Sequence, residues 1–222
     1  MPGLDAIIFD FDGTLADVPL DFELMKRKIA ALGEVFLGQR PEPDDTPALE
    51  WLSALVDQVM AVDEAEGKEF RSRGRLVIAA MELDAARTGR LFEFTRPGLT
   101  LLAQRGVAAG IITRNISAAV RAVFPDVDDL TRVFIPREET DRLKPDPDHL
   151  LRALDAVGAD PARSLMVGDH PMDVRTGLNA GTLTAGVTSG RMTAADFAPL
   201  NPTYVEPDVA ALLGRLEADG LI

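Results

Sequence analysis

Short apolar segments recur along the chain and alternate with stretches whose apolar residues have helical spacing. Six of these segments are predicted to be strands: Asp5–Asp10, Val107–Thr113, Arg132–Ile135, Ser164–Asp169, Thr182–Val187 and Thr203–Val205. Helices are predicted between them at Pro97–Arg105, Asn115–Phe124 and Pro147–Val157, each closed by a glycine or a proline. This alternation indicates an α/β fold, a doubly wound parallel sheet with helices on both faces.

The segment from Ala16 to Arg90 breaks this alternation. It contains no convincing strand, and its apolar residues recur at intervals of three and four, as in amphipathic helices. Two such patterns are found, one at Leu49, Leu52, Val56, Val59 and Val62–Ala65 and the other at Leu76, Ala79, Ala80 and Leu83. We therefore expect residues 1–15 and 91–222 to form an α/β core domain and residues 16–90 to form an all-helical insert.

The composition of the 222-residue chain disfavours several classes of site and partner. The chain contains no cysteine, which excludes disulfides and thiolate metal sites. A net charge of −13 disfavours nucleic acid and anionic membranes as partners. No apolar run approaches the roughly 20 residues that span a bilayer, and the N-terminus lacks the pattern of a signal peptide. We expect a cytoplasmic protein, whose oligomeric state the sequence leaves open.

The first predicted strand ends in two carboxylates, Asp10 and Asp12, followed by Gly13. Side chains two residues apart on a strand point the same way, so both acids are expected at one site at the carboxyl end of the strand. A divalent cation between them is the simplest relief of their repulsion. An all-oxygen ligand set favours a hard cation, most plausibly Mg²⁺. The alternative is a solvated Asp-Gly turn, which this motif alone does not exclude.

A second polar group follows the strand predicted at Val107–Thr113. Thr113, Arg114 and Asn115 offer a hydroxyl and two side-chain donors where a helix is expected to begin. The N-terminus of a helix has unsatisfied N–H groups and a positive potential, which attract phosphate. The alternative is that Thr113 or Asn115 only caps this helix.

Two further segments carry charges toward the same end of the sheet. Lys144 stands before a proline, where it could balance neighbouring acids and hold an anionic substrate, or be an ordinary surface lysine at a turn. Asp169 closes a predicted strand, and Asp173 falls in the first turn of the next helix. Ligands of doubly wound sheets bind at the carboxyl ends of the strands where the winding reverses, so we expect these acids to meet Asp10 there.

Taken in order, these segments resemble the four motifs of the haloacid dehalogenase (HAD) superfamily: Asp10-x-Asp12-Gly-Thr, then Thr113, then Lys144-Pro, then Gly168-Asp169-x-x-x-Asp173. The helical insert directly after the first motif resembles the C1 cap of the phosphoglycolate phosphatase-like branch. The resemblance spans nearly the whole chain. It implies a HAD-like Rossmannoid core, formed by residues 1–15 and 91–222, and a cap domain formed by residues 16–90.

The resemblance also implies a role for each motif residue. Asp10 would be the nucleophile that forms an aspartyl-phosphate, and Asp12 the general acid and base. Thr113 and Lys144 would bind the transferring phosphoryl group. Together with their neighbours, the candidate substrate-binding residues are Thr113, Arg114, Asn115 and Lys144. The implied ligands of Mg²⁺ are Asp10, Asp12 through its backbone carbonyl, Asp169 and, in a supporting role, Asp173.

The function implied is a Mg²⁺-dependent phosphatase that hydrolyses a small phosphorylated metabolite, with phosphoglycolate as the nearest example in the family. A phosphomutase with the same aspartyl-phosphate is an alternative. A dehalogenase is disfavoured because it would not need Asp12. From a different class, a receiver-like signalling domain also holds a phosphoryl group on an aspartate, but it gives no reason for Asp12 or for the insert. A non-catalytic scaffold would be expected to lack one of the acids, and none is missing.

The insert also contains a basic run in an otherwise acidic chain, at Lys68, Arg71, Arg73 and Arg75. A cap that closes over the site could use one of these side chains to grip a second anionic group of the substrate. The alternative is the solvated face of a helix.

Overall fold

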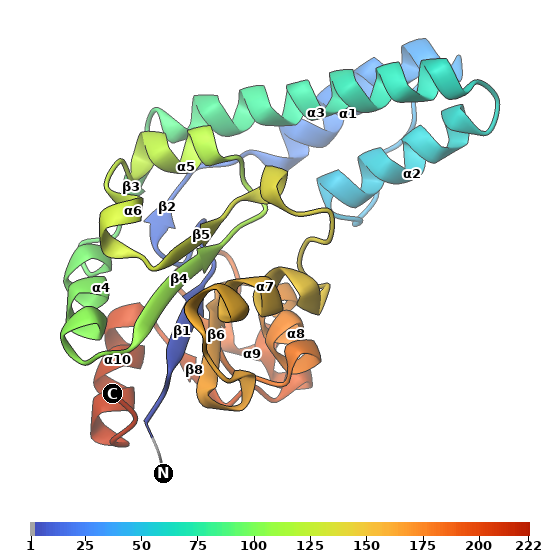
Figure 1. Ribbon diagram of the computed structural model, residues 1–222. Helices are drawn as coiled ribbons and strands as arrows, with labels where there is room; N and C mark the ends of the chain where they lie inside the picture. The colour runs from blue at the N-terminus through green and yellow to red at the C-terminus, as the bar shows by residue number, and fades with distance from the viewer. Residues whose placement is uncertain (1–2) are drawn as a thin grey trace. The chain divides into compact units, whose positions relative to one another are not determined.

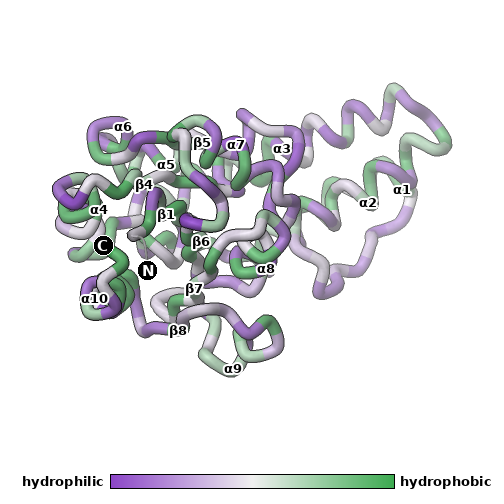
Figure 2. The backbone as a smooth tube through the Cα atoms, turned by 60° about the horizontal axis from the view of Figure 1, so that its bottom comes forward, coloured by the Kyte–Doolittle hydropathy of each residue, from purple (hydrophilic) through white to green (hydrophobic). Residues whose placement is uncertain are grey.

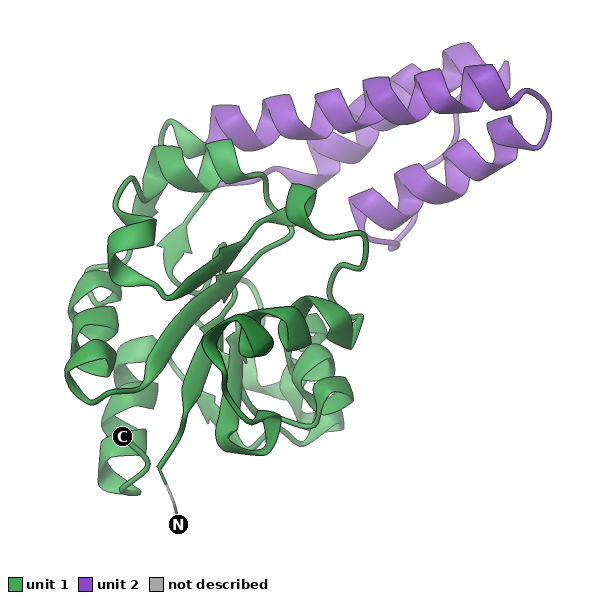
Figure 3. Cartoon of the chain, viewed as in Figure 1, with its two compact units in different colours: residues 1–18, 86–222 green, residues 19–85 purple. Residues whose placement is uncertain are grey.

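The computed structural model describes residues 3–222 and divides them into two compact units (Figure 3). Within the described chain, unit 1 comprises residues 3–18 and 86–222, and unit 2 comprises Pro19–Ala85. Unit 2 is therefore inserted in the sequence of unit 1, close to the limits expected for the helical insert.

Unit 1 is built on a parallel sheet of six strands, counted among residues 3–222, in the order β5-β4-β1-β6-β7-β8 (Figure 1). The strands are β1 Ala6–Phe9, β4 Ala108–Ile112, β5 Val133–Ile135, β6 Ser164–Gly168, β7 Leu183–Val187 and β8 Tyr204–Glu206. Each overlaps its predicted segment. The winding direction reverses at β1, where Phe9 lies opposite Ile111 of β4 and Val167 of β6. The doubly wound parallel α/β fold expected from the sequence is confirmed.

Helices cover both faces of this sheet (Figure 1). One face packs against α7 (Pro147–Val157) and α8 (Pro171–Ala180), and the other against α4 (Thr95–Gln104) and α10 (Val209–Ala218). The buried side chains of β1 alternate between the two cores, with Ile7 and Phe9 on one side and Ala6 and Ile8 on the other. Burial on both faces explains why the strands form continuous apolar stretches, visible for β1 and β4 in Figure 2.

Shorter elements complete unit 1: α5 Ser117–Val123, α6 Val127–Leu130 and α9 Ala194–Phe197, with 3₁₀ turns η1 Arg137–Glu139, η2 Pro161–Arg163 and η3 Ala198–Leu200. The prediction for α7 agrees with the structure at both ends, because Pro147 starts that helix and Gly158 ends it with a φ of 67°. No helix among residues 3–222 is long and apolar enough to cross a membrane.

Unit 2 contains three helices in its described residues, α1 (Phe22–Leu37), α2 (Ala48–Met60) and α3 (Glu64–Ala86), the last of which ends in unit 1. Aromatic stacking joins α1 to α3, with the rings of Phe36 and Phe70 4.9 Å apart. α2 and α3 approach closely at Gly74, where a Cβ would lie 2.4 Å from Leu52. The helical character predicted for this segment is thus present.

The buried face of α3 differs from the predicted one. Leu76 and Leu83, which define the predicted stripe, are exposed, whereas Phe70, Gly74 and Ile78 are buried. The apolar pattern was misleading because the contact face depends on a glycine, which carries no hydrophobic signal but lets the helices approach.

A second difference concerns the two ends of the insert. Ala16–Asp17 forms strand β2 and Arg90–Leu91 forms strand β3, and the two pair antiparallel, with Ala16 opposite Leu91. The expectation of an insert without strands is therefore wrong at its ends. Two residues per strand are too few to show an alternating pattern, and their pairing joins segments that are distant in the sequence.

Candidate active site

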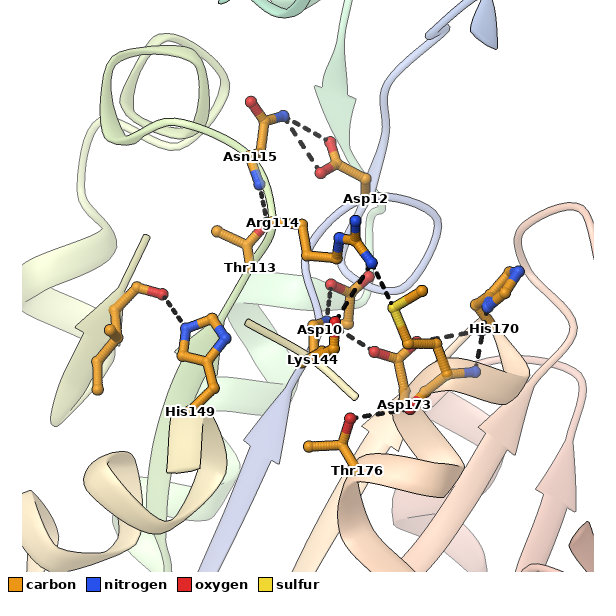
Figure 4. Close-up of polar contacts among 12 residues, drawn as sticks. Asp10, Asp12, Thr113, Arg114, Asn115, Lys144, His149, His170, Asp173 and Thr176 are labelled. Atoms are coloured by element: carbon orange, nitrogen blue, oxygen red, sulfur yellow. Dashed lines mark hydrogen bonds and ion pairs between the residues drawn. The ribbon is translucent and has the colours of Figure 1, made fainter. Parts of the chain in front are cut away.

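The carboxyl ends of three adjacent strands meet around Asp10 (Figure 4). Asp10 follows β1, Thr113 follows β4 and Asp169 follows β6. Because β1 pairs in parallel with both β4 and β6, these three ends lie on the same edge of the sheet. This is the edge at which the sequence analysis placed the site, at the point where the winding reverses.

Lys144 is almost completely buried, with 2% of its surface exposed, and its ammonium group lies between two carboxylates. Its Nζ donates to Oδ1 of Asp10 at 2.5 Å and to Oδ1 of Asp173 at 2.6 Å. Burial lowers the pKa of Lys144, but the charges of Asp10 and Asp173 raise it more, so the pKa lies above its usual value. The lysine therefore remains positively charged and balances the two acids.

Asp10, Asp169 and Asp173 form a group of three acids whose contributing carboxylate oxygens all lie within 4.8 Å of one another. Burial raises the pKa of Asp10 to about 6 and the pKa of Asp169 to about 8. The charge of Asp173 raises the pKa of both. A cation bound among these oxygens would favour the ionised carboxylates and so lower the pKa of both Asp10 and Asp169. An all-carboxylate donor set fits a hard divalent metal such as Mg²⁺.

Two glycines leave room for the carboxylate of Asp169. A Cβ on Gly13, which has a φ of 82°, would lie 2.3 Å from Oδ2 of Asp169, and a Cβ on Gly190 would lie 1.9 Å from the same oxygen. Next to Gly190, the hydroxyl of Ser189 donates to the carbonyl of Gly13 at 2.7 Å. The loop after β7 thus supports the site. Sequence reasoning missed it because Ser-Gly is also ordinary loop composition.

The carboxylate of Asp12 faces the side chain of Asn115 (Figure 4). Nδ2 of Asn115 donates to both carboxylate oxygens of Asp12, at 3.1 and 3.2 Å. The carboxylate of Asp12 does not belong to the three-acid group found in residues 3–222. The implied metal contact of Asp12, through its backbone carbonyl, stays a prediction.

Thr113 and Arg114 lie beside this arrangement. Oγ1 of the buried Thr113 accepts a hydrogen bond from the backbone N–H of Asn115 at 3.0 Å. Nη1 of Arg114 donates to the carbonyl of Lys144 at 3.2 Å and lies 2.8 Å from Sδ of Met172. Arg114 therefore brings a second positive charge to the side of the site that holds Lys144. Phosphate binding by either residue stays a prediction.

The helix that follows β4 begins at Ser117, two residues later than predicted. Oε1 of Glu138 accepts a hydrogen bond from the backbone N–H of Ser117 at 2.8 Å. A carboxylate of the protein therefore already contacts this helix start, which gives no support to the phosphate site expected there. Positive charge at the candidate site comes from Lys144 and Arg114.

The two histidines have structural contacts. Nδ1 of His170 accepts from the backbone N–H of Met172 at 3.1 Å and so caps α8, while Oδ2 of Asp173 accepts from the backbone N–H of His170 at 3.2 Å. This reciprocal cap holds Asp173 in position for Lys144. Nε2 of the buried His149 lies 3.0 Å from the carbonyl oxygen of Ile135.

Comparison with known proteins finds a family model and a solved structure that match most of the chain. The family model described as haloacid dehalogenase-like hydrolase matches residues 4–181, most of the chain. A solved structure of a haloacid dehalogenase-like family protein from Streptococcus pneumoniae aligns with a TM-score of 0.63 at 18% identity, over 96% of this chain and 98% of that one.

Three curated relatives have names that specify phosphate substrates. An N-acetylmuramic acid 6-phosphate phosphatase from Pseudomonas putida is 31% identical over 84% of each chain. A phosphoglycolate phosphatase from Psychrobacter arcticus is 27% identical over 95% of this chain and 94% of its own. The pyrophosphatase PpaX from Bacillus cereus is 26% identical over 83% of each chain. These relatives are phosphatases with three different named substrates.

Proposed function

The chain belongs to the haloacid dehalogenase-like hydrolase family, and we propose that it hydrolyses a small phosphate monoester through an aspartyl-phosphate on Asp10. The observation that carries this proposal is the buried contact between Asp10 and Lys144 at the carboxyl end of β1. The lysine fixes the orientation of the carboxylate and would attract the phosphoryl group to the same place. A carboxylate nucleophile needs no activating base.

Two proton transfers by Asp12 complete the proposed reaction. In the first step an oxygen of Asp10 bonds to phosphorus, the bond from phosphorus to the leaving oxygen breaks, and the carboxyl group of Asp12 protonates that oxygen. In the second step the carboxylate of Asp12 takes a proton from water, whose oxygen bonds to phosphorus and displaces Asp10. Inorganic phosphate then leaves, and both side chains return to their starting states.

A divalent metal, with Mg²⁺ as our specific proposal, would be held by Asp10, Asp169 and the backbone carbonyl of Asp12, with Asp173 in support. The carboxylates offer oxygen donors only, and they lie close enough together to share an ion. Such an ion would neutralise the charge of the acids and of the incoming phosphoryl group. Lys144, Thr113 and Arg114 are proposed to bind the phosphoryl oxygens.

The proposed substrate is a small phosphorylated metabolite, because the three named relatives act on N-acetylmuramic acid 6-phosphate, phosphoglycolate and pyrophosphate. We further propose that unit 1 is the catalytic core and that unit 2 serves as its cap. The net charge of −13 adds support by disfavouring polyanionic partners such as nucleic acid.

A turnover assay tests the proposal. The wild-type protein would be assayed with phosphoglycolate, N-acetylmuramic acid 6-phosphate, pyrophosphate and p-nitrophenyl phosphate, each in EDTA and after addition of Mg²⁺. We expect many turnovers per enzyme with Mg²⁺ and none in EDTA. Ca²⁺ should substitute poorly, because it prefers more ligands at longer distances. Binding has a readout besides activity: Mg²⁺ should raise the melting temperature of the wild type, but not of Asp169→Asn.

Three results would overturn parts of this proposal. Release of no more than one phosphate per enzyme would favour the receiver-like alternative, and equal rates with EDTA and Mg²⁺ would remove the metal. Interconversion of phosphate isomers without net phosphate release would favour a phosphomutase. The matched control for the metal experiment is Asp141→Asn, because Asp141 is an exposed carboxylate outside the three-acid group.

A further inference from the structure

Asn115 lies in the turn between β4 and α5, with 3% of its surface exposed. Sequence reasoning placed it among the substrate-binding residues. We propose instead that Asn115 is a positioning residue, which holds the carboxylate of Asp12 in place for proton transfer. This inference rests on the proposed function, in which Asp12 is the general acid and base.

The orientation of the Asn115 amide is fixed by its own turn. Oδ1 accepts a hydrogen bond from the backbone N–H of Ile116 at 2.8 Å, and only the oxygen of the amide group can do so. The Nδ2 group must therefore point the other way, where it donates to both oxygens of Asp12 at 3.1 and 3.2 Å (Figure 4). The amide thus faces a carboxylate with its donor side.

The backbone of Asn115 is anchored on both sides. Its N–H donates to Oγ1 of Thr113 at 3.0 Å, and its carbonyl accepts from the backbone N–H of Arg137 at 3.0 Å. These contacts fix the starting point of the side chain independently of any ligand. Asn115 is therefore a rigid support for Asp12, of the kind that a proton-transfer group needs to stay in productive geometry.

Asp12 needs such a support because it lies in the loop beyond the end of β1. Asp12 is partly exposed, and the ammonium group of Lys144 already binds Asp10 and Asp173. The contact with Asn115 holds the carboxylate of Asp12 in one orientation. An acid and base whose orientation is fixed can serve the leaving oxygen and the water.

The two roles for Asn115 predict different kinetics. A residue that binds the phosphoryl group contacts every substrate equally, so its loss lowers kcat/KM for all esters and weakens inhibition by inorganic phosphate. A residue that positions Asp12 matters most when the leaving oxygen must be protonated. Alkyl phosphates require this proton, whereas p-nitrophenolate leaves as a stable anion.

The test uses Asn115→Ser, whose hydroxyl can still accept from the Ile116 N–H but is too short to reach Asp12. We expect kcat/KM for an alkyl phosphate to fall about 10- to 100-fold, the effect of one hydrogen bond to a charged group. For p-nitrophenyl phosphate kcat/KM should change less than about threefold, and the inhibition constant of inorganic phosphate should stay within about twofold. Circular dichroism checks the fold.

A double-mutant cycle with Asp12→Asn supplies the control. If Asn115 acts through Asp12, then the loss of about 10- to 100-fold that Asn115→Ser causes for the alkyl phosphate should shrink to less than about twofold in the Asp12→Asn background, measured on its residual activity. Asn179→Ser, which removes an amide donor to the carbonyl of Pro145, should leave the ratio between the two substrates unchanged. If Asn115→Ser does not fold, Asn115→Ala, which removes the same amide donor without adding a charge, should give the same preferential loss for the alkyl ester.

Equal losses for both esters, or a weaker inhibition by phosphate in Asn115→Ser, would return Asn115 to phosphoryl binding and overturn this inference alone. A wild-type protein that hydrolyses neither ester would overturn the proposed function, and this inference with it. The two failures are therefore distinguishable.

Discussion

Two lysine–carboxylate pairs of the same length lie in different surroundings. Lys144 of unit 1 contacts Asp173 at 2.6 Å, and Lys68 of unit 2 contacts Glu64 at 2.6 Å. The side chains of the first pair are 2% and 4% exposed, whereas those of the second are 65% and 72% exposed. An exposed pair contributes about 0–1 kcal/mol, while removal of one partner from a buried pair costs about 3–5 kcal/mol. At equal distance, the burial of an ion pair therefore decides how much it contributes to the free energy of unfolding.

The basic run of unit 2, at Lys68, Arg71, Arg73 and Arg75, also forms ion pairs that are exposed. Lys68 and Arg73 pair with acids one helical turn away, at Glu64 and Glu69, and Arg71 lies 3.8 Å from Asp57. The side chains of Lys68, Arg71 and Arg73 are 65%, 43% and 54% exposed, which favours the interpretation of this run as a solvated helix face. Unit 1 instead concentrates its buried charges at the carboxyl end of the sheet, where they can act on a ligand.

The largest effect is expected for Lys144→Met compared with Lys68→Met. The first leaves two buried carboxylates without their cation and should lower the free energy of unfolding by about 3–5 kcal/mol, besides abolishing turnover. The second should cost less than about 1 kcal/mol and leave turnover unchanged. Urea denaturation in EDTA measures both variants. Losses of equal size would mean that burial does not distinguish the two pairs.

Asp10→Asn separates chemistry from stability in the buried cluster. The amide is nearly isosteric and its oxygen can still accept from Lys144, but it is a poor nucleophile. We expect kcat to fall at least about a hundredfold while circular dichroism stays unchanged. Glu64→Gln, the matched change in the exposed pair, should leave kcat unaltered. A folded Asp10→Asn variant with more than about a hundredth of wild-type kcat would contradict the role of Asp10 as nucleophile.

His149 extends the comparison to pH. Burial lowers the pKa of His149 to about 4 from its usual 6.5, so between these values the unfolded chain binds a proton that the folded chain does not. The stability contributed by the neutral ring is complete above pH 6.5 and is lost as the pH falls toward 4. As the pH falls from 6.5 to about 4, the free energy of unfolding of the wild type should decrease by up to about 3 kcal/mol relative to that of His149→Gln. Parallel pH profiles of urea stability would contradict the prediction.

The smallest effect is expected for Glu69→Gln, which removes the partner of Arg73 on the surface of α3. The free energy of unfolding should change by about 0.3–0.5 kcal/mol at low salt and by less at high salt, because mobile ions screen exposed charges. Chemical denaturation at two salt concentrations measures the change. A loss above about 1 kcal/mol would place this pair closer to the buried class than its exposure implies.

Sequence reasoning found the sheet because burial on both faces leaves a direct record in the strands. β1, β4 and β6 consist almost entirely of small or apolar residues, and each is followed by a polar residue of the site, at Asp10, Thr113 and Asp169. Because these strands are parallel neighbours, the residues that follow them lie at the same edge of the sheet. The meeting of Asp10, Thr113 and Asp169 was therefore predictable, whereas a place for Lys144, in the loop before α7, was expected from the resemblance to the family motifs.

What sequence reasoning missed depends on contacts between distant segments. The contact between Asn115 and Asp12 joins the turn after β4 to the loop after β1, and neither motif specifies which way its side chain turns. The support from Ser189 comes from a loop without a recognisable motif. Such details follow from tertiary packing, which local patterns of hydrophobic residues do not record.

The β2–β3 pair brings the two ends of the insert together on unit 1. Ala16 lies opposite Leu91, so the chain leaves and re-enters unit 1 at neighbouring backbone positions. The entropy lost on closing a loop grows only with the logarithm of its length, and each doubling costs about 0.6 kcal/mol. For unit 1, all of unit 2 is thus the loop of a very long hairpin. Whole helices could be added to it or removed from it at little cost to the sheet that carries Asp10.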